Sequence, residues 1–436
     1  MKIQYWLALF LCSVQIGYAQ TPNEKIIPID TAFAMAGRNS THLHLSKSVT
    51  ETAHKAVDAA NNMRLPSLNV EIAAKYLGDG SIMNRDFTHA QNAPIPHFGN
   101  NFSLEASYVV FAGGAISTTI EKAELEAQVA ALAHEKNSMD IRFLVAGHYL
   151  NLYKLYNQKK VFQKNIEQTN ELIRQVKAKL SAGMALDNDL TRYELMQQNL
   201  ELAIIEIDNN ISILNKHLCI TLGLPSETTI LPDSSVQNIE NLPLFNAGLM
   251  NDAIAQRPEI KIHSLKKDLA EKDVRLAHAD KYPSIVIIGA DHLNGPITFE
   301  IPPVNKNLNY WYLGVGISYK LESLYKSGKN IALAKTAYNT AELAYRAEIE
   351  NTQTAVHEAQ TNYAEAFDKL QTYRKSFQLA TENYNVINNR YKNDLVLITE
   401  MLDASNMKLK AELQVVNAKL DVVFNYFKLQ REIGTL

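Results

Sequence analysis

The chain has 436 residues, of which 46% are hydrophobic and 8% aromatic, with 43 basic and 46 acidic side chains. This length is sufficient for two or three ordinary domains, because a single core rarely grows beyond about 250–300 residues. A net charge of -3 argues against a nucleic-acid partner. Only 17 glycines and 13 prolines favour long helices over a loop-rich β-sandwich.

Residues 1–19 have the pattern of a signal peptide. Lys2 supplies a positive charge, an apolar run follows, and Gly17 and Ala19 place small residues at the cleavage position. We therefore expect cleavage after Ala19 and export of the chain. One cysteine, Cys12, lies in this segment, so Cys219 would remain alone and an intrachain disulfide is not expected.

The remainder of the chain repeats one order of elements. Residues 180–223 align without a gap with residues 391–434, and residues 64–68 resemble residues 281–285. This period is far longer than the roughly 20–50 residues of a solenoid unit, so it indicates two copies of one half-protein. The predicted divisions are a first repeat at 20–224, an equatorial linker at 225–247 and a second repeat at 248–436.

Each repeat is predicted to contain a helix, two strands and two very long helices. In the first repeat these are a helix at about 43–63, strands at about 65–77 and 102–112, and helices at about 116–180 and 186–222. In the second repeat they are a helix at about 259–281, strands at about 284–294 and 309–320, and helices at about 329–391 and 396–433.

The long helices are predicted from the absence of helix-breaking residues. No proline occurs in 97–224, and neither glycine nor proline occurs in 329–433. A helix over 329–391 would rise about 95 Å at about 1.5 Å per residue, which makes a shaft and not a compact domain. Apolar residues from Leu186 to Leu218 recur at steps of three and four, which is typical of a left-handed coiled coil. A coiled-coil scaffold or adaptor without a pore is a less favoured alternative that shares this pattern.

The strands separate these alternatives. Leu68, Val70 and Ile72 alternate with polar residues, and Leu313 and Val315 alternate with small ones. Each predicted strand has about ten residues, the length with which a tilted strand crosses a bilayer, although soluble hairpins with one buried face remain an alternative. Four strands cannot close a barrel, and an open edge in lipid leaves backbone groups unpaired. Strands that span a membrane would therefore require several copies of the chain.

Several motifs in this order and spacing resemble the TolC-like outer membrane efflux proteins over almost the whole mature chain. They are the duplicated half, Arg257-Pro258-Glu259, the strand entries at Pro66 and Pro283, Phe111-Ala112-Gly113-Gly114, Tyr391 followed by Leu402-Asp403-Ala404, and the closing Leu222-Gly223 and Ile433-Gly434.

The resemblance implies a mainly α fold with transmembrane β-structure. Four strands per chain would contribute to a trimeric 12-stranded outer-membrane β-barrel, and long helices would form a periplasmic α-barrel. The implied function is a subunit of a homotrimeric export duct in the outer membrane. Its implied partners are outer-membrane lipid, an inner-membrane transporter and a periplasmic adaptor (membrane fusion protein).

The resemblance also implies roles for the two turns between long helices. They would form the periplasmic entrance, with adaptor contacts at Gly183, Leu186, Asp394 and Leu397. Gly183 can adopt a positive φ for the chain reversal. Asp394 stands where the family often has glycine, and Asn393-Asp394 can tolerate a left-handed conformation at some strain.

The implied gate consists of two pairs of residues. Glu400 and Asp403 match the positions whose carboxylates form an acidic ring around the constriction, which favours cations. Asp189 and Tyr391 match an acid–tyrosine latch between neighbouring hairpins. Without the resemblance, the first pair would be solvated helix acids, and the second a surface acid and a core tyrosine.

No catalytic signature is present, so we expect no enzyme activity, no cofactor and no metal site. His42 and His44 are two residues apart and do not share a helix face, which argues against metal binding there. The alternative to a channel is a periplasmic coiled-coil adaptor or scaffold protein without a pore.

Overall fold

The computed structural model describes residues 23–234, 242 and 249–436. The predicted signal peptide at 1–19 lies outside the described residues, and so does most of the predicted linker beyond residue 234. Among the helices that are described, none combines the length and the apolarity that a membrane span requires.

The elements of the first half are four helices and a set of strands. They are β1 (Asn23–Ile27), α1 (Ile29–Asn39), α2 (Thr41–Asn61), a 3₁₀ turn (Asn62–Arg64), β2 (Ser67–Tyr76), β3 (Gly80–Ile82), β4 (Gln91–Ala93), β5 (Phe98–Ala112), α3 (Ala115–Ser181) and α4 (Asp187–Leu222).

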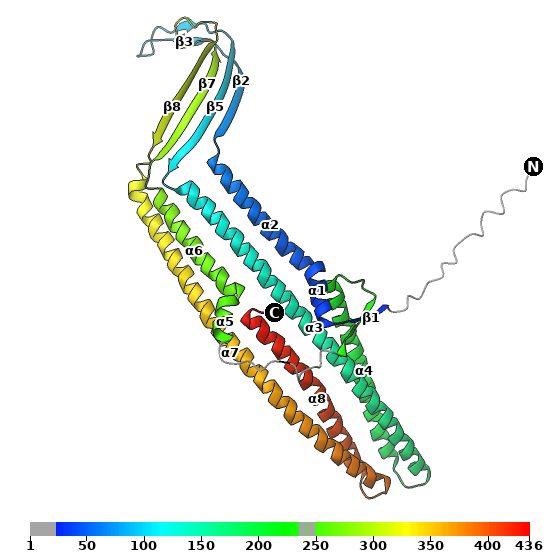
Figure 1. The fold of residues 1–436 in the computed structure, drawn as a ribbon. Helices are drawn as coiled ribbons and strands as arrows, with labels where there is room; N and C mark the ends of the chain where they lie inside the picture. Colours follow the sequence, from blue (N-terminus) through cyan, green and yellow to red (C-terminus); the bar gives the residue numbers. More distant parts are fainter. Residues whose placement is uncertain (1–22, 235–241, 243–248) are drawn as a thin grey trace, which may run out of the picture. The chain divides into compact units, whose positions relative to one another are not determined.

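The second half repeats the order of helix, two strands and two long helices. Its elements are β6 (Thr228–Pro232), α5 (Leu249–Gln256), α6 (Pro258–Ala279), β7 (Ser284–Gly295), β8 (Leu308–Ser318), α7 (Ser323–Lys392) and α8 (Ile398–Ile433). The mainly α fold with four long strands per chain is thus confirmed (Figure 1).

The contacts group the chain into two compact units, and each unit draws on both halves. The first comprises Met1–His44, Ser138–Asp252 and Ala355–Leu436, and the second comprises Leu45–Asn137 and Ala253–Thr354. Helices α3 and α7 each contribute one part to both units.

The second unit contains an antiparallel sheet with the strand order β2-β5-β7-β8 (Figure 1). Each strand is next in sequence to one helix, and these helices lie in the matching order α2-α3-α6-α7. Ser46 of α2 hydrogen-bonds His134 of α3 at 2.7 Å, and Lys272 of α6 pairs with Glu121 of α3 at 2.5 Å. A further contact places the ammonium of Lys267 on α6 5.5 Å from the ring centroid of Tyr345 on α7.

The turn from β5 into α3 requires glycine. Gly113 has a φ of 61°, and a Cβ there would lie 2.7 Å from the carbonyl oxygen of Ala279. A side chain at this position would therefore combine backbone strain with a collision against the end of α6. This explains the paired glycines that follow the second predicted strand.

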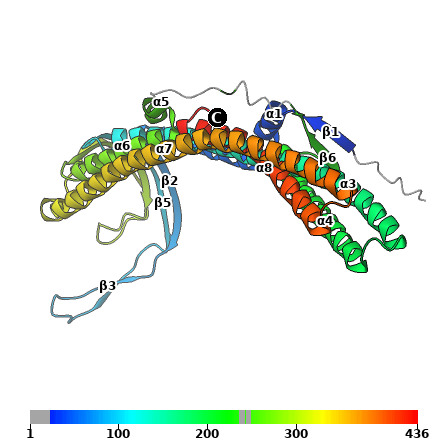
Figure 2. The ribbon, with the colours of Figure 1, turned by 90° about the horizontal axis from the view of Figure 1, so that it is seen from below.

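The first unit contains two antiparallel helical hairpins, α3–α4 and α7–α8, which lie side by side in both views (Figures 1 and 2). Strand β1 pairs in parallel with β6, and both lie beside α1 (Figure 2). A core that includes Ala36, Tyr149, Leu218 and Ile230 joins these elements. The Tyr149 hydroxyl donates to the carbonyl of Ile27 at 2.7 Å, which fixes β1 against α3.

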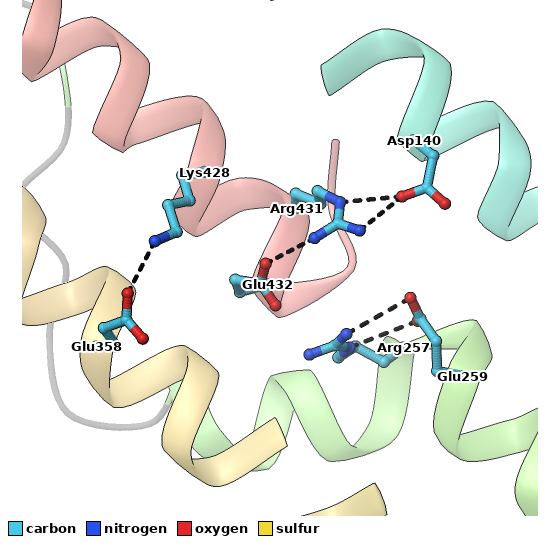
Figure 3. Close-up of polar contacts among 7 residues, drawn as sticks. All are labelled: Asp140, Arg257, Glu259, Glu358, Lys428, Arg431 and Glu432. Carbon is cyan, nitrogen blue, oxygen red and sulfur yellow. Dashed lines mark hydrogen bonds and ion pairs between the residues drawn. The ribbon is translucent and has the colours of Figure 1, made fainter. Parts of the chain in front are cut away.

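Ion pairs link α8 to both of its neighbours within the first unit. Arg431 donates to Oδ1 of Asp140 on α3 at 2.7 and 3.0 Å, and Lys428 pairs with Glu358 on α7 at 3.0 Å (Figure 3). In the second unit, the buried Arg257 pairs with Glu259 across Pro258, at the first residues of α6 (Figure 3).

Candidate functional site

The two hairpin turns of the first unit have the same backbone design. After α3, the amide of Met184 donates to the carbonyl of Lys179 at 2.8 Å, and Gly183 has a φ of 74°. After α7, the amide of Leu395 donates to the carbonyl of Arg390 at 3.0 Å, and Asp394 has a φ of 60°. In both turns, a residue in the left-handed conformation reverses the chain, so that the next amide donates a hydrogen bond to a carbonyl in the last turn of the helix.

Apolar side chains project from both turns. The exposed fractions are 66% for Met184 and 70% for Leu186 at the first turn, and 73% for Leu395 and 70% for Leu397 at the second. Leu186 and Leu397 each precede the first residue of the returning helix. Leu186 and Leu397 were predicted from the sequence. Met184 and Leu395 were not, although they occupy matching positions of the duplication and could have been found from it.

The hairpins pack together just behind their turns. The core there consists of Leu172, Ile173, Val176, Tyr193, Tyr391 and Met401. Burial raises the pKa of the Tyr391 hydroxyl, and the Lys179 ammonium offsets part of that rise. Burial also raises the pKa of Tyr193, and the neighbouring Tyr391 hydroxyl raises it further. Both phenols therefore remain protonated at neutral pH.

Lys179 is the polar link between the two hairpins. Its ammonium pairs with the Asp394 carboxylate and donates to the carbonyl of Tyr391 at 3.3 Å. It also lies 4.7 Å from the centroid of the Tyr391 ring. Sequence reasoning missed Lys179, although a basic residue in the last turn of a helix commonly interacts with nearby carbonyl groups.

The predicted latch residues are near one another but have different partners. Within the described part of one chain, no hydrogen bond joins Asp189 to Tyr391. The Asp189 carboxylate instead accepts from the amide of Leu186 at 3.1 Å, which caps helix α4. A latch between neighbouring chains thus stays a prediction.

The predicted acidic ring is represented by two exposed carboxylates on α8. Glu400 and Asp403 are three residues apart, and among the described residues of one chain neither forms a hydrogen bond or ion pair. Three residues is a spacing at which helix side chains lie on one face. Both carboxylates are therefore available to a pore or to a neighbouring chain.

The four-stranded sheet has one strongly apolar face. Val70 and Ile72 of β2 and Leu313 and Val315 of β8 lie on this face and are 69–75% exposed. The registers place them in line with Leu104 of β5, which pairs with Val70, and with Ile287 and Leu293 of β7. Asp291 of β7, which pairs with Leu104, also lies on this face. The opposite face has polar residues such as Asn69, Glu71, Ser103, Glu105 and His292.

The outer edges of this sheet are unpaired within the described chain. Strand β2 pairs only with β5, and β8 pairs only with β7. Strand β7, whose residues 285–288 are apolar on both faces, is one of the two central strands. No group of three or more His, Cys, Asp or Glu residues in the described ranges is placed to hold a metal ion.

Comparisons with known proteins address the family. Residues 249–435 match the family described as outer membrane efflux protein. Nodulation protein T of Rhizobium leguminosarum bv. trifolii is 23% identical over 287 residues, which are 63% of this chain and 60% of that protein. The pyoverdine export outer membrane protein OpmQ of Pseudomonas aeruginosa is 23% identical over 267 residues, which are 59% of this chain and 54% of that protein. The chain thus spans only 54–60% of the length of these relatives.

Solved structures share the fold over almost the whole chain. The outer-membrane channel OprN has a TM-score of 0.79 at 16% identity, with 94% of this chain and 90% of that chain covered. VceC of Vibrio cholerae has a TM-score of 0.78 at 15% identity, with 93% of this chain and 96% of that chain covered. The match of residues 249–435, the related sequences and the shared fold confirm the resemblance to the outer membrane efflux proteins seen in the motifs.

Proposed function

We propose that the chain is one subunit of a homotrimeric export channel in the outer membrane, with its long helices in the periplasm. The observation that carries this proposal is the four-stranded sheet with an exposed apolar face and two unpaired edges. The family and the structural neighbours are channels and not enzymes, which supports a passive duct without a catalytic step. No observation favours the adaptor or scaffold alternative.

The sheet edges argue for assembly. In hydrocarbon, each unpaired backbone group costs several kcal/mol, so an isolated sheet of this kind is unstable there. Pairing of β2 from one chain with β8 from the next would satisfy both edges, and a closed ring of three chains would contain twelve strands. The apolar face would then contact lipid, and the polar face would line the lumen.

The strand lengths fit a bilayer. The shortest of the four, β2, has 10 residues, and β5 has 15. Ten residues at about 3.3 Å each extend about 33 Å, and a tilt of about 45° reduces this to about 23 Å along the membrane normal, close to the height of the apolar band of outer-membrane barrels.

The helical turns provide the surface for partners. We propose that the exposed apolar residues at both turns, together with the predicted Gly183, Leu186, Asp394 and Leu397, contact a periplasmic adaptor that connects the channel to an inner-membrane transporter. Exposed apolar side chains on both turns support this role, because clustered apolar surface marks interaction sites. In the trimer, Glu400 and Asp403 would contribute six carboxylates to the entrance.

Two neighbouring residues of β8 test the proposal. Leu313 lies on the apolar face and Tyr312 on the opposite face, so Leu313→Arg and Tyr312→Arg form a matched pair. An arginine on a lipid-facing position costs about 2–4 kcal/mol at the bilayer midplane. We therefore expect Leu313→Arg to reduce the yield of membrane-inserted trimer, while Tyr312→Arg assembles and shifts the ion selectivity of single channels in planar bilayers.

Equal behaviour of the two variants would contradict the assignment of the faces. A wild-type protein that is monomeric and soluble without detergent would overturn the channel itself.

A further inference from the structure

Two histidines from neighbouring helices have their rings in contact beside the core of the first unit. The ring centroids of His148 on α3 and His217 on α4 are 5.3 Å apart, with the ring planes at 46°. Residues next to them in sequence, Tyr149 and Leu218, are fully buried. The packing of these neighbours holds both Cα positions, so the two imidazoles are presented by rigid elements.

One nitrogen of this pair lacks a partner. The Nδ1 atom of His148 is enclosed by protein and makes no hydrogen bond with any described residue. Enclosed side-chain nitrogens nearly always have a partner, because an unsatisfied one costs about 1–3 kcal/mol. A ligand bound at this position would satisfy the nitrogen.

The separation of the rings suits a shared metal ion. A metal–nitrogen bond of about 2.1 Å and a ring nitrogen about 1.2 Å from its centroid place two tetrahedrally arranged imidazoles with centroids about 5 Å apart. The observed 5.3 Å is close to that value.

The protonation state also suits metal binding. Burial lowers the pKa of His148, and a positive charge on His217 would lower it further. His148 is therefore neutral at neutral pH, which is the form in which imidazole binds metals. His217 is exposed, which gives an ion and its remaining water ligands access from solvent.

We propose that His148 and His217 form a bidentate site for a divalent transition-metal ion of the imidazole-binding class, such as Zn²⁺, Ni²⁺ or Cu²⁺. Water fills the other coordination positions, because the pair supplies only two protein ligands. A bound ion would join α3 to α4 within the first hairpin. This inference does not depend on the channel function.

The test is Zn²⁺ titration of the purified full-length protein in detergent by isothermal calorimetry, after removal of metals with EDTA. We expect one saturable site per chain whose affinity falls at least about tenfold in His148→Gln and in His217→Gln. His357→Gln is the matched control, because His357 is also an exposed histidine of a long helix in the first unit. Its Zn²⁺ affinity should equal that of the wild type.

A second readout excludes a purely structural effect. Zn²⁺ should raise the thermal unfolding temperature of the wild type and of His357→Gln, but not of His217→Gln. Because His217 is exposed, its replacement leaves the core intact even if His148→Gln fails to fold. Absence of a saturable site in the wild type, or undiminished binding in His217→Gln, would overturn the proposal.

Discussion

Loss of the Lys179 ammonium should weaken the contact between the two hairpin turns at the proposed entrance. In the Lys179→Met variant the apolar stem of the side chain remains, but the ion pair with Asp394, the hydrogen bond to the Tyr391 carbonyl and the contact with the Tyr391 ring are lost. These contacts join the α3–α4 hairpin to the α7–α8 hairpin. Their removal should therefore favour separation of the two turns.

The magnitude follows from exposure. The Lys179 side chain is 19% exposed but that of Asp394 is 63% exposed, so solvent screening limits the ion pair to about 0.2–1 kcal/mol. The contact with the aromatic ring adds about 0.5–1 kcal/mol. A total of about 1–2 kcal/mol changes the ratio of open to closed channels by about 5- to 30-fold.

The assay is the open probability of single channels in planar bilayers. Lys177→Met is the control, because Lys177 pairs with Glu194 at 3.5 Å inside the first hairpin, and among the described residues no ion pair joins it to the second. We expect Lys179→Met to raise the open probability and Lys177→Met to leave it unchanged. Asp394→Asn retains a residue that tolerates positive φ and should reproduce part of the effect. An unchanged open probability in both Lys179→Met and Asp394→Asn would refute this reasoning.

Three further results are expected. Glu400→Ala with Asp403→Ala should weaken block of the channel by multivalent cations, and equal block in both forms would reject an acidic ring. Leu218→Ala should lower the free energy of unfolding by about 2–5 kcal/mol, because Leu218 is completely buried, whereas Leu202→Ala on the 54% exposed side of α4 should cost far less; denaturant titration distinguishes them. Burial raises the pKa of Tyr149 to about 12, above its unfolded value of about 10, so the stability this group provides is present below pH 10 and is lost as the pH rises to about 12. Tyr149→Phe should make alkaline unfolding less steep.

The long helices could be predicted because few residues interrupt them. The predicted start of α7 differs from the observed one, and the difference shows how strongly a glycine ends a helix. The helix begins at Ser323 and passes through Gly328, although the predicted helix starts at 329. A glycine in an exposed helix costs only about 1 kcal/mol, which the rest of a long helix can outweigh. Glycine therefore marks a possible end, whereas proline marks a stronger one.

The ends of the strands and the small elements were harder to predict. Strand β5 begins at Phe98, before the predicted 102, because it pairs with β2 from Phe98 and with β7 from Asn100. The polar Asn100 and Asn101 hide this extension in the sequence. Strands β1 and β6 pair across some 200 positions of the chain, and five residues carry no detectable periodicity of their own. Contacts of this kind depend on the tertiary fold.

Some features of the two hairpin turns could be predicted from the sequence and others could not. The two turns and the exposed Leu186 and Leu397 follow from the duplication, because matched backbone designs require matched residues. The role of Lys179 does not follow, since its partners Tyr391 and Asp394 lie on the other hairpin. Pairing across hairpins is decided by how the helices pack, and sequence periodicity does not contain that information.

The duplication is imperfect at one functionally important position. Gly183 and Asp394 occupy corresponding left-handed positions, but only Asp394 has a carboxylate, and Lys179 binds it. The corresponding basic residue is Arg390, the residue that corresponds to Asp394 is glycine, and within the described chain Arg390 makes no ion pair. The ionic link can therefore form in only one direction, from the first hairpin to the second. Around the entrance of the proposed trimer, contacts within a chain and contacts between chains must then differ in chemistry, so the six hairpins need not separate together.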